Sequence, residues 1–293
     1  MTSFLDILLG GVFHAAVLFL VAAGLQLVFG VQKIFNLACG SFYALGAYTG
    51  ISAVTWALGH GLPRGLFLLP LLAAGLALGV VGPPVEALLR TVYKRAEAFQ
   101  LLLTFALVLI LQDVLRLLWG ANPQELGNLY MRYGKVGTRA LSVPTYNLLV
   151  IGAALAVAIG LGLFLKRTRF GRVLRATAED RETSATLGVE VGRVYTVVFT
   201  LGTVLGTLGG ALVVPTAAAS LDMSVEFVVE AFAVVVIGGL GSIRGAVVGA
   251  LTVGLMRAFA VSFLPELEML SIYLVVILVL IFRPAGLFGR TAA

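Results

Sequence analysis

Long runs without Asp, Glu, Lys or Arg make up most of the chain, and short polar stretches separate them. A helix needs about 20 apolar residues to cross a hydrocarbon core roughly 30 Å thick, so these runs predict membrane-spanning helices. Six runs are long enough to span, the fourth interrupted only by Asp113 and Arg116: residues 7–32, 34–63, 65–85, 98–119, 140–165 and 194–221. A final span is expected at residues 263–282.

The last quarter departs from this pattern, because Arg244 separates two charge-free runs of 13 and 12 residues, 231–243 and 245–256. In one continuous span this arginine would lie near mid-membrane, at a cost of about 2.5–3.5 kcal/mol. Four glycines, which turn readily, crowd the junction: Gly238, Gly239, Gly241 and Gly245. We therefore predict a broken helix near residues 238–245, with two pieces each about 18–20 Å long.

Composition supports a membrane protein, because 60% of the 293 residues are hydrophobic, 12% are charged and the mean hydropathy is +1.07. The longest polar stretches, 120–140 and 166–193, are too short for a core of their own. A single transmembrane domain over residues 1–293 is therefore expected. A lone cysteine, Cys39, excludes an intrachain disulfide framework, and two histidines leave little for a metal centre.

Basic residues predict the orientation of the bundle. Seven of the 20 Lys and Arg residues lie in the 166–193 loop, and placing it in the cytoplasm brings seven more inside, so 14 of 20 are internal. This bias follows the positive-inside rule and puts the N-terminus outside and the C-terminus inside. The net charge of +6 therefore reflects membrane topology, and no nucleic-acid partner is expected.

The 166–193 loop mixes apolar and charged residues and predicts a short helix along the membrane face, with Gly188 at its C′ position. One interpretation is a basic anchor for the membrane surface. A docking element for a cytoplasmic partner is favoured, because anchoring gains nothing from the acids Glu179, Asp180 and Glu182.

Polar residues inside the apolar runs are candidates for lining a transport pathway. Together with the irregular backbone expected at the break, they give this set: Gln26, Asn36, Cys39, Ser41, Gly239, Gly241 and Ser242. Two ion pairs are expected within helices, Glu86–Arg90 and Asp113–Arg116, and His14 is expected to be a hydrogen-bonded structural residue. The sequence shows no dense relay of intramembrane charges, which disfavours an ion-coupled carrier.

Catalytic motifs are missing from the sequence. No Gly-x-x-x-x-Gly-Lys-Ser/Thr phosphate loop, His-Glu-x-x-His or Gly-x-Ser-x-Gly pattern occurs. We therefore expect no cofactor, no ATP hydrolysis by this chain and no enzymatic activity.

Four segments, in order, resemble the permease subunits of branched-chain amino-acid ABC transporters: residues 35–48, 170–188, 230–250 and 281–288. The third resembles the hallmark of the family and the second its cytoplasmic coupling loop. Two positions depart from the family pattern. Cys39 stands where the family more often has His or Gln, and Arg244 replaces a frequent Pro.

The resemblance implies an all-α, type II-like importer permease with about 8–10 transmembrane helices in a bacterial or archaeal cytoplasmic membrane. It implies import of branched-chain or hydrophobic amino acids by alternating access. Expected partners are cytoplasmic ATP-binding subunits, a second permease subunit (identical or different) and an extracytoplasmic solute-binding protein. The coupling loop would contact the ATPase through Arg172, Arg175, Glu179, Asp180, Glu182 and Gly188. Urea or short amides are alternative solutes, and an ion-coupled secondary transporter is a less favoured class.

Overall fold

The computed structural model describes residues 4–93, 95–138 and 141–289, and most of this part is helical. The first half supplies α1 (Phe4–Gln32), α2 (Cys39–Gly59), α3 (Leu68–Ala77), α4 (Gly82–Arg90), α5 (Glu97–Trp119) and α6 (Thr145–Arg167). The second half supplies α7 (Arg169–Glu179), α8 (Arg181–Thr186), α9 (Val191–Val213), α10 (Met223–Gly238), α11 (Ile243–Phe263) and α12 (Glu268–Phe282). A short antiparallel hairpin pairs β1 (Lys135–Thr138) with β2 (Leu141–Pro144).

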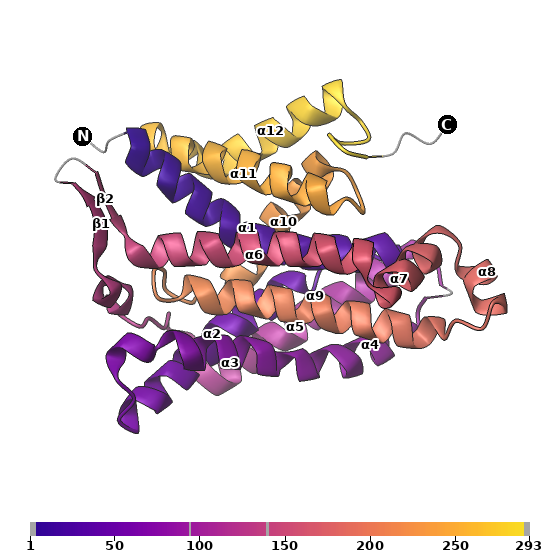
Figure 1. Ribbon diagram of the computed structural model, residues 1–293, viewed down its shortest axis with the longest axis horizontal. Coiled ribbons are helices and arrows are strands. Elements are labelled where there is room, and N and C mark those ends of the chain that lie inside the picture. Colours follow the sequence, from indigo (N-terminus) through magenta and orange to yellow (C-terminus); the bar gives the residue numbers. More distant parts are fainter. Residues whose placement is uncertain (1–3, 94, 139–140, 290–293) are drawn as a thin grey trace.

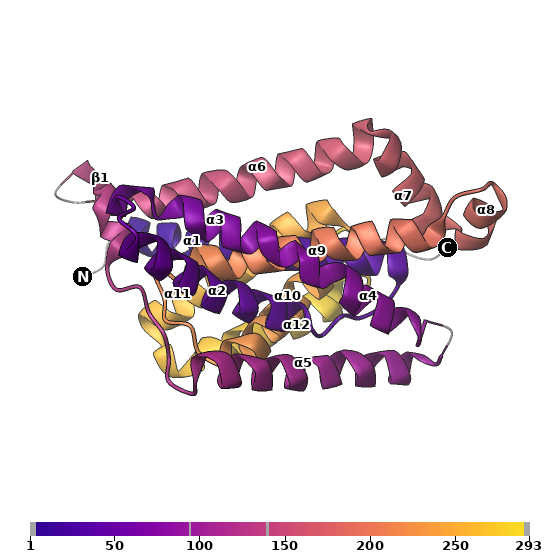
Figure 2. The ribbon, with the colours of Figure 1, turned by 90° about the horizontal axis from the view of Figure 1, so that it is seen from below.

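The two ends of the bundle are distinct. The long helices run along the longest axis, with α7 and α8 at one end and the β hairpin at the other (Figure 1). The helices α1, α4, α6 and α12 finish at the α7–α8 end, where α5, α9 and α11 begin (Figure 2). The chain therefore alternates between the ends in the order that the sequence predicted.

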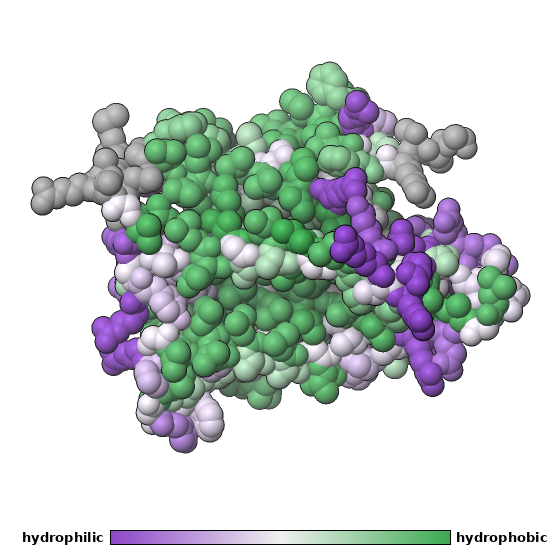
Figure 3. All heavy atoms as spheres, viewed as in Figure 1, coloured by the Kyte–Doolittle hydropathy of each residue, from purple (hydrophilic) through white to green (hydrophobic). Residues whose placement is uncertain are grey.

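Six helical stretches in the described part are long and apolar enough to cross a membrane: α1, residues 64–90, α5, α6, α9 and α11. The middle of the molecule is covered by hydrophobic side chains, and hydrophilic ones gather at its two ends (Figure 3). Leu117 of α5 and Ile159 of α6, for example, are 85% and 56% exposed. A protein dissolved in water rarely exposes so large an apolar surface. The solvent of this surface is hydrocarbon, and the chain is a multi-pass membrane protein.

Two helices form the centre of the bundle. In both α1 and α9, 61% of the most apolar stretch is buried, against 22% in α5 and 17% in α6. All four helices are apolar, so composition does not separate them. Close contacts at glycine do: Gly24 of α1 and Gly202 of α9 bring the two central backbones together, whereas the glycines of α6 have no neighbouring atom within 4 Å of a Cβ position.

The predicted break is confirmed, since α10 ends at Gly238 and α11 begins at Ile243. Only two of the four glycines turn the chain: Gly239 and Gly241 have φ of +91° and +78°. Gly238 and Gly245 instead bring the backbones of α10 and α11 into contact, leaving no room for a Cβ atom. Turning and close packing thus explain different members of the same cluster.

The predicted length of the second piece was wrong. The sequence placed its end at residue 256, before Arg257, but α11 continues to Phe263 over 21 residues, about 31 Å of helix. Arg257 does not end the helix because Glu230 of α10 and Glu268 of α12 neutralise it. The adjoining α12 begins at Glu268, later than the expected residue 263.

Glycine also sets the distance between α2 and α9. A Cβ atom on Gly210 would overlap the Tyr43 carbonyl group, and one on Gly46 would overlap the backbone of Thr207. Gly160 on α6 has no neighbouring atom within 4 Å of a Cβ position. The two kinds of glycine therefore differ in what they contribute to stability.

We predict that Gly210→Ala lowers the thermal unfolding midpoint of the detergent-solubilised protein, because overpacking costs about 1–3 kcal/mol. The matched control, Gly160→Ala, leaves the midpoint unchanged or raises it, since alanine favours helix by about 1 kcal/mol over glycine. Equal midpoints for the two variants would contradict the close approach of α2 and α9.

Candidate functional site

The break between α10 and α11 is closed by Gln26 of α1. This side chain is 1% exposed, and its Nε2 donates to the Gly239 carbonyl oxygen at 3.0 Å. Its Oε1 accepts a hydrogen bond from the Gly241 N–H at 2.5 Å. The Ser242 hydroxyl caps α11 by accepting from the Gly245 N–H at 3.1 Å. Because unpaired backbone groups cost several kcal/mol in hydrocarbon, a single amide side chain makes the irregular segment tolerable there.

The segment after α12 closes the same break from the other side. The Leu287 and Phe288 N–H groups donate to the carbonyl oxygens of Ile237 and Gly238, at 2.8 and 3.1 Å. These carbonyls belong to the last turn of α10, where a helix has no partners of its own. The 281–288 segment thus caps a distant helix, a role that sequence reasoning missed because no sequence pattern links residue 287 to residue 237.

A second irregular segment, residues 33–38, joins α1 to α2. Asn36 is buried within it, and its Oδ1 accepts from the Ala38 N–H at 3.1 Å. Cys39 and Ser41 lie buried in the first turn of α2, and the Ser41 hydroxyl has no hydrogen-bond partner in the described part of the chain. The structure therefore brings Gln26, Gly239 and Gly241 together. Asn36, Cys39 and Ser41 form a separate group.

The loop predicted to hold one helix forms two, α7 and α8, because Asp180 interrupts it in an extended conformation. The Asp180 carboxylate caps α8 by accepting from the N–H groups of Glu182 and Thr183, at 2.9 and 3.0 Å. Hydrogen bonds from Thr183 hold the pKa of this carboxyl below its usual value. The stabilisation from this cap is therefore fully present at pH values above the usual pKa of aspartate. It is lost only as the pH falls through the lowered pKa of Asp180. Gly188, with φ of +87°, follows the last turn of α8 as predicted.

One face of the α7–α8 pair is anchored and the other is open. Leu174 and Thr177 are buried, and Gly171 contacts the backbone of Phe164 at the end of α6. The sequence-predicted coupling residues are all exposed: Arg172, Arg175, Glu179, Asp180, Glu182 and Gly188. Leu187, an apolar side chain beside them, is 80% exposed.

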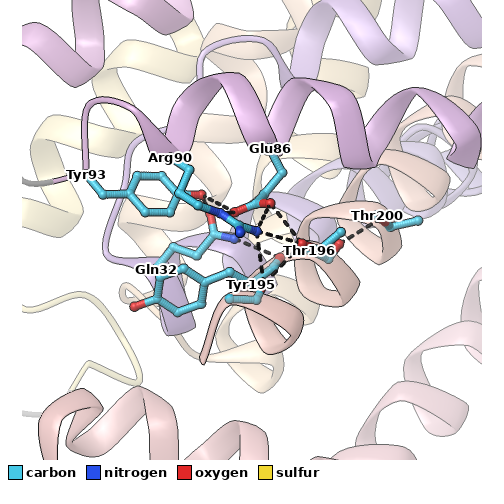
Figure 4. Close-up of polar contacts among 8 residues, drawn as sticks. Gln32, Glu86, Arg90, Tyr93, Tyr195, Thr196 and Thr200 are labelled. Atoms are coloured by element: carbon cyan, nitrogen blue, oxygen red, sulfur yellow. Dashed lines mark hydrogen bonds and ion pairs between the residues drawn. The ribbon is translucent and has the colours of Figure 1, made fainter. Parts of the chain in front are cut away.

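A buried carboxylate lies where α4 and α9 meet near this end (Figure 4). Glu86 is fully buried and pairs with Arg90, which confirms the first predicted intrahelical ion pair. Its oxygens also accept from the hydroxyls of Thr196 and Tyr93, at 2.9 and 3.0 Å. Burial and the adjacent Glu86 charge raise the pKa of Tyr93 far above its usual value, so this phenol remains a donor. The second predicted pair, Asp113–Arg116, is not formed in the described part.

The Glu86 cluster extends to α1 and α8. The Gln32 Nε2 donates to the Tyr195 carbonyl oxygen at 2.9 Å, and the Gln32 Oε1 accepts from the Tyr93 hydroxyl at 3.4 Å (Figure 4). The Arg181 guanidinium of α8 lies 5.6 Å from the centre of the Tyr195 ring. Four helices therefore share one polar network at the base of the α7–α8 pair.

A second charged cluster joins α1, α10, α11 and α12. Glu230 binds His14 at 2.8 Å and Arg257 at 2.7 Å, and Arg257 binds Glu268 at 2.6 Å. This cluster was not predicted from the sequence, which shows no dense relay of charges. His14 and Arg257, which contact each other directly, lie 243 positions apart along the chain, so only the fold brings these charges together. The expectation that His14 is hydrogen-bonded is confirmed.

A polytopic helical bundle with a sealed break and a projecting helix pair is the architecture of a membrane permease. The chain belongs to the family described as "Branched-chain amino acid transport system / permease component", whose model matches residues 7–281.

Named relatives agree with this membership. The chain is 27% identical to the high-affinity branched-chain amino acid transport system permease proteins BraD of Pseudomonas aeruginosa and LivH of Escherichia coli, over 98% of this chain and 96% of each relative. It is also 27% identical to a probable branched-chain amino acid transport permease protein LivH of Methanocaldococcus jannaschii, over 97% of this chain and 92% of that one. The chain is also similar to the solved structure of PsaBC from Streptococcus pneumoniae in complex with Fab, at 13% sequence identity and a TM-score of 0.46. This match covers 93% of the present chain and 89% of the other.

We predict that Glu230→Gln destabilises the protein by about 1–3 kcal/mol, because a neutral amide cannot replace the buried carboxylate that binds His14 and Arg257, while Arg257 keeps Glu268 as a partner. In the double variant Glu230→Gln/Arg257→Met the two losses should be less than additive, because both single variants break the same pair, although Glu268 then also loses its cation. Thermal unfolding of the purified protein in detergent measures both effects. Additive losses in the double variant would show that the two groups do not form a pair.

Proposed function

We propose that this chain is the membrane-spanning subunit of an ATP-driven importer, which moves branched-chain or other hydrophobic amino acids into the cytoplasm by alternating access. The observation that carries the proposal is the α7–α8 pair, which is anchored on one face and presents alternating charges on the other. The names of the relatives support the solute class. The sequence holds no phosphate-binding loop, so the energy must come from a separate ATPase.

The ATP-binding subunits would dock against the open face of α7–α8 in the cytoplasm. Arg172, Glu179 and Glu182 offer both signs of charge, and exposed Leu187 offers an apolar anchor. Charged residues at the rim of an interface fix register, while a buried apolar residue supplies affinity. The role of Asp180 would be to hold α8 in place for docking, since its carboxylate is already used as the cap.

Movement of the docked pair would pass into the bundle by two routes. α7 rests on the end of α6 through Gly171, and α8 contacts α9 through Arg181 and Tyr195. From Tyr195, hydrogen bonds lead to Gln32 of α1 and, through the neighbouring Thr196, to the Glu86 cluster. We propose these contacts as the physical link between the ATPase and the central helices.

The transport pathway would pass the two irregular segments, 33–38 and 239–242, where backbone leaves the helical pattern. The candidates with side chains not already engaged there are Cys39 and Ser41, because Gln26 is committed to sealing the break. A second permease subunit, identical or different, would complete the pathway. A solute-binding protein would dock at the hairpin end, where Arg64, Asn128 and Arg132 border a groove of about 590 Å³.

One observation favours an ion-coupled carrier, namely the His14–Glu230–Arg257–Glu268 cluster. Each carboxylate in it is paired with a cation or with His14, however, and a satisfied network of this kind is typical of a structural tie. Urea and short amides remain the alternative solutes for an importer of this architecture.

We expect proteoliposomes that contain this permease with its ATP-binding subunits, its partner permease and its binding protein to accumulate labelled leucine only when ATP is supplied on the ATPase side. Unlabelled isoleucine or valine should compete, and urea or acetamide should not. Leucine uptake by the permease alone under an ion gradient would refute the proposal, and competition by urea would reassign the solute.

We predict that Glu179→Lys combined with Glu182→Lys lowers ATP-dependent uptake at least tenfold, because reversing two charges repels a complementary surface. Asp180→Asn is the matched control, since asparagine caps a helix as well as aspartate does. Membrane yield and thermal stability should be unchanged in both variants. Wild-type uptake by the charge-reversed variant would place the docking surface elsewhere.

A further inference from the structure

A groove of about 520 Å³ lies on the outside of the bundle near the α7–α8 end, between α6, α7 and the start of α11. Three basic side chains from three helices border it: Lys166, Arg175 and Arg244. All three are exposed, and none forms an ion pair or side-chain hydrogen bond within the described residues. Hydrophilic side chains gather at this end beside a broad hydrophobic surface (Figure 3).

Apart from Ser242, the rest of the groove is lined by apolar residues and glycines. Ile159 and Leu163 of α6 and Val247 of α11 line it, and Ile159 and Leu163 are 56% and 45% exposed. No acidic side chain lies among the lining residues. The groove therefore has a cationic mouth at the membrane–water interface and an apolar wall that continues toward the membrane interior.

We propose that this groove binds an anionic phospholipid, with the phosphate between Lys166 and Arg244 and an acyl chain along α6. Basic pockets between transmembrane helices commonly bind anionic headgroups, and the apolar wall suits the attached chain. The free N–H groups at the start of α11 add to the positive potential, but the three side chains define the site. A soluble anion would not use the apolar wall.

This site also explains Arg244, which stands where the resembled family more often has proline. An arginine next to the break would be costly inside hydrocarbon, but at the interface it can hold a phosphate. The lipid would link α6 to α11, two helices that are otherwise in little contact. This link would lie next to the break that Gln26 closes. Bound lipid should thus stabilise the bundle where the chain is irregular.

The test uses the purified full-length chain in detergent, titrated with phosphatidylglycerol or with phosphatidylcholine of the same acyl chains. We expect phosphatidylglycerol alone to raise the thermal midpoint and to remain bound in native mass spectrometry. Lys166→Gln/Arg244→Gln should weaken this binding about 30-fold, because two phosphate contacts are removed. Lys166→Arg/Arg244→Lys should retain it, which shows that the loss in the first variant is not misfolding.

Arg167→Gln/Arg193→Gln is the matched control, because it removes two exposed cations from the same end without touching the groove. Equal weakening by this control, unchanged binding in Lys166→Gln/Arg244→Gln, or equal competition by free glycerol phosphate would each overturn the proposal. The groove would instead serve the ATPase if Lys166→Gln/Arg244→Gln abolished ATPase binding while phosphatidylglycerol remained bound.

Discussion

Hydrocarbon offers no partners for backbone polar groups, and this constraint governs how the chain can interrupt a helix inside the membrane. At the break between α10 and α11, the Gln26 amide pairs with one carbonyl and one N–H group, and the 287–288 backbone pairs with two carbonyls of α10. The break therefore depends on residues from both ends of the chain. Two of the four family-like segments, 230–250 and 281–288, meet through this requirement, which gives their sequence patterns a physical reason.

Charge within the bundle follows a related principle. Glu86 and Glu230 are buried carboxylates. Glu86 pairs with Arg90 of its own helix and accepts from Thr196 of α9, and Glu230 pairs with His14 of α1 and Arg257 of α11. Such networks add little net stability, but breaking one partner is costly, so they fix which helices lie together. The Glu86 network is placed to join the α7–α8 pair to the bundle, whereas the Glu230 network ties α1 to the last three helices near the other end.

The α7–α8 end carries two surfaces with different chemistry. The outward face of the helix pair mixes acids and bases, as a protein partner would require. The groove between α6 and α11 combines cations with a mainly apolar lining and has no acidic lining residue, which suits a lipid. Arg175 lies in the groove although its sequence context grouped it with the coupling residues. Position on a helix face, rather than position in the sequence, separates the two surfaces.

Much of this architecture could be predicted from the sequence, because it depends on residues that are close together along the chain. The spans, the broken helix, the Glu86–Arg90 pair and the helix end at Gly188 are all of this kind. Only the tertiary structure decided which apolar helices are central, how far α11 extends, and what partners Gln26, Glu230 and Arg257 have. These features depend on contacts between residues up to 243 positions apart. The sequence shows that a buried polar or charged residue requires a hydrogen-bond or ion-pair partner, and only the fold determines which distant residue that partner is.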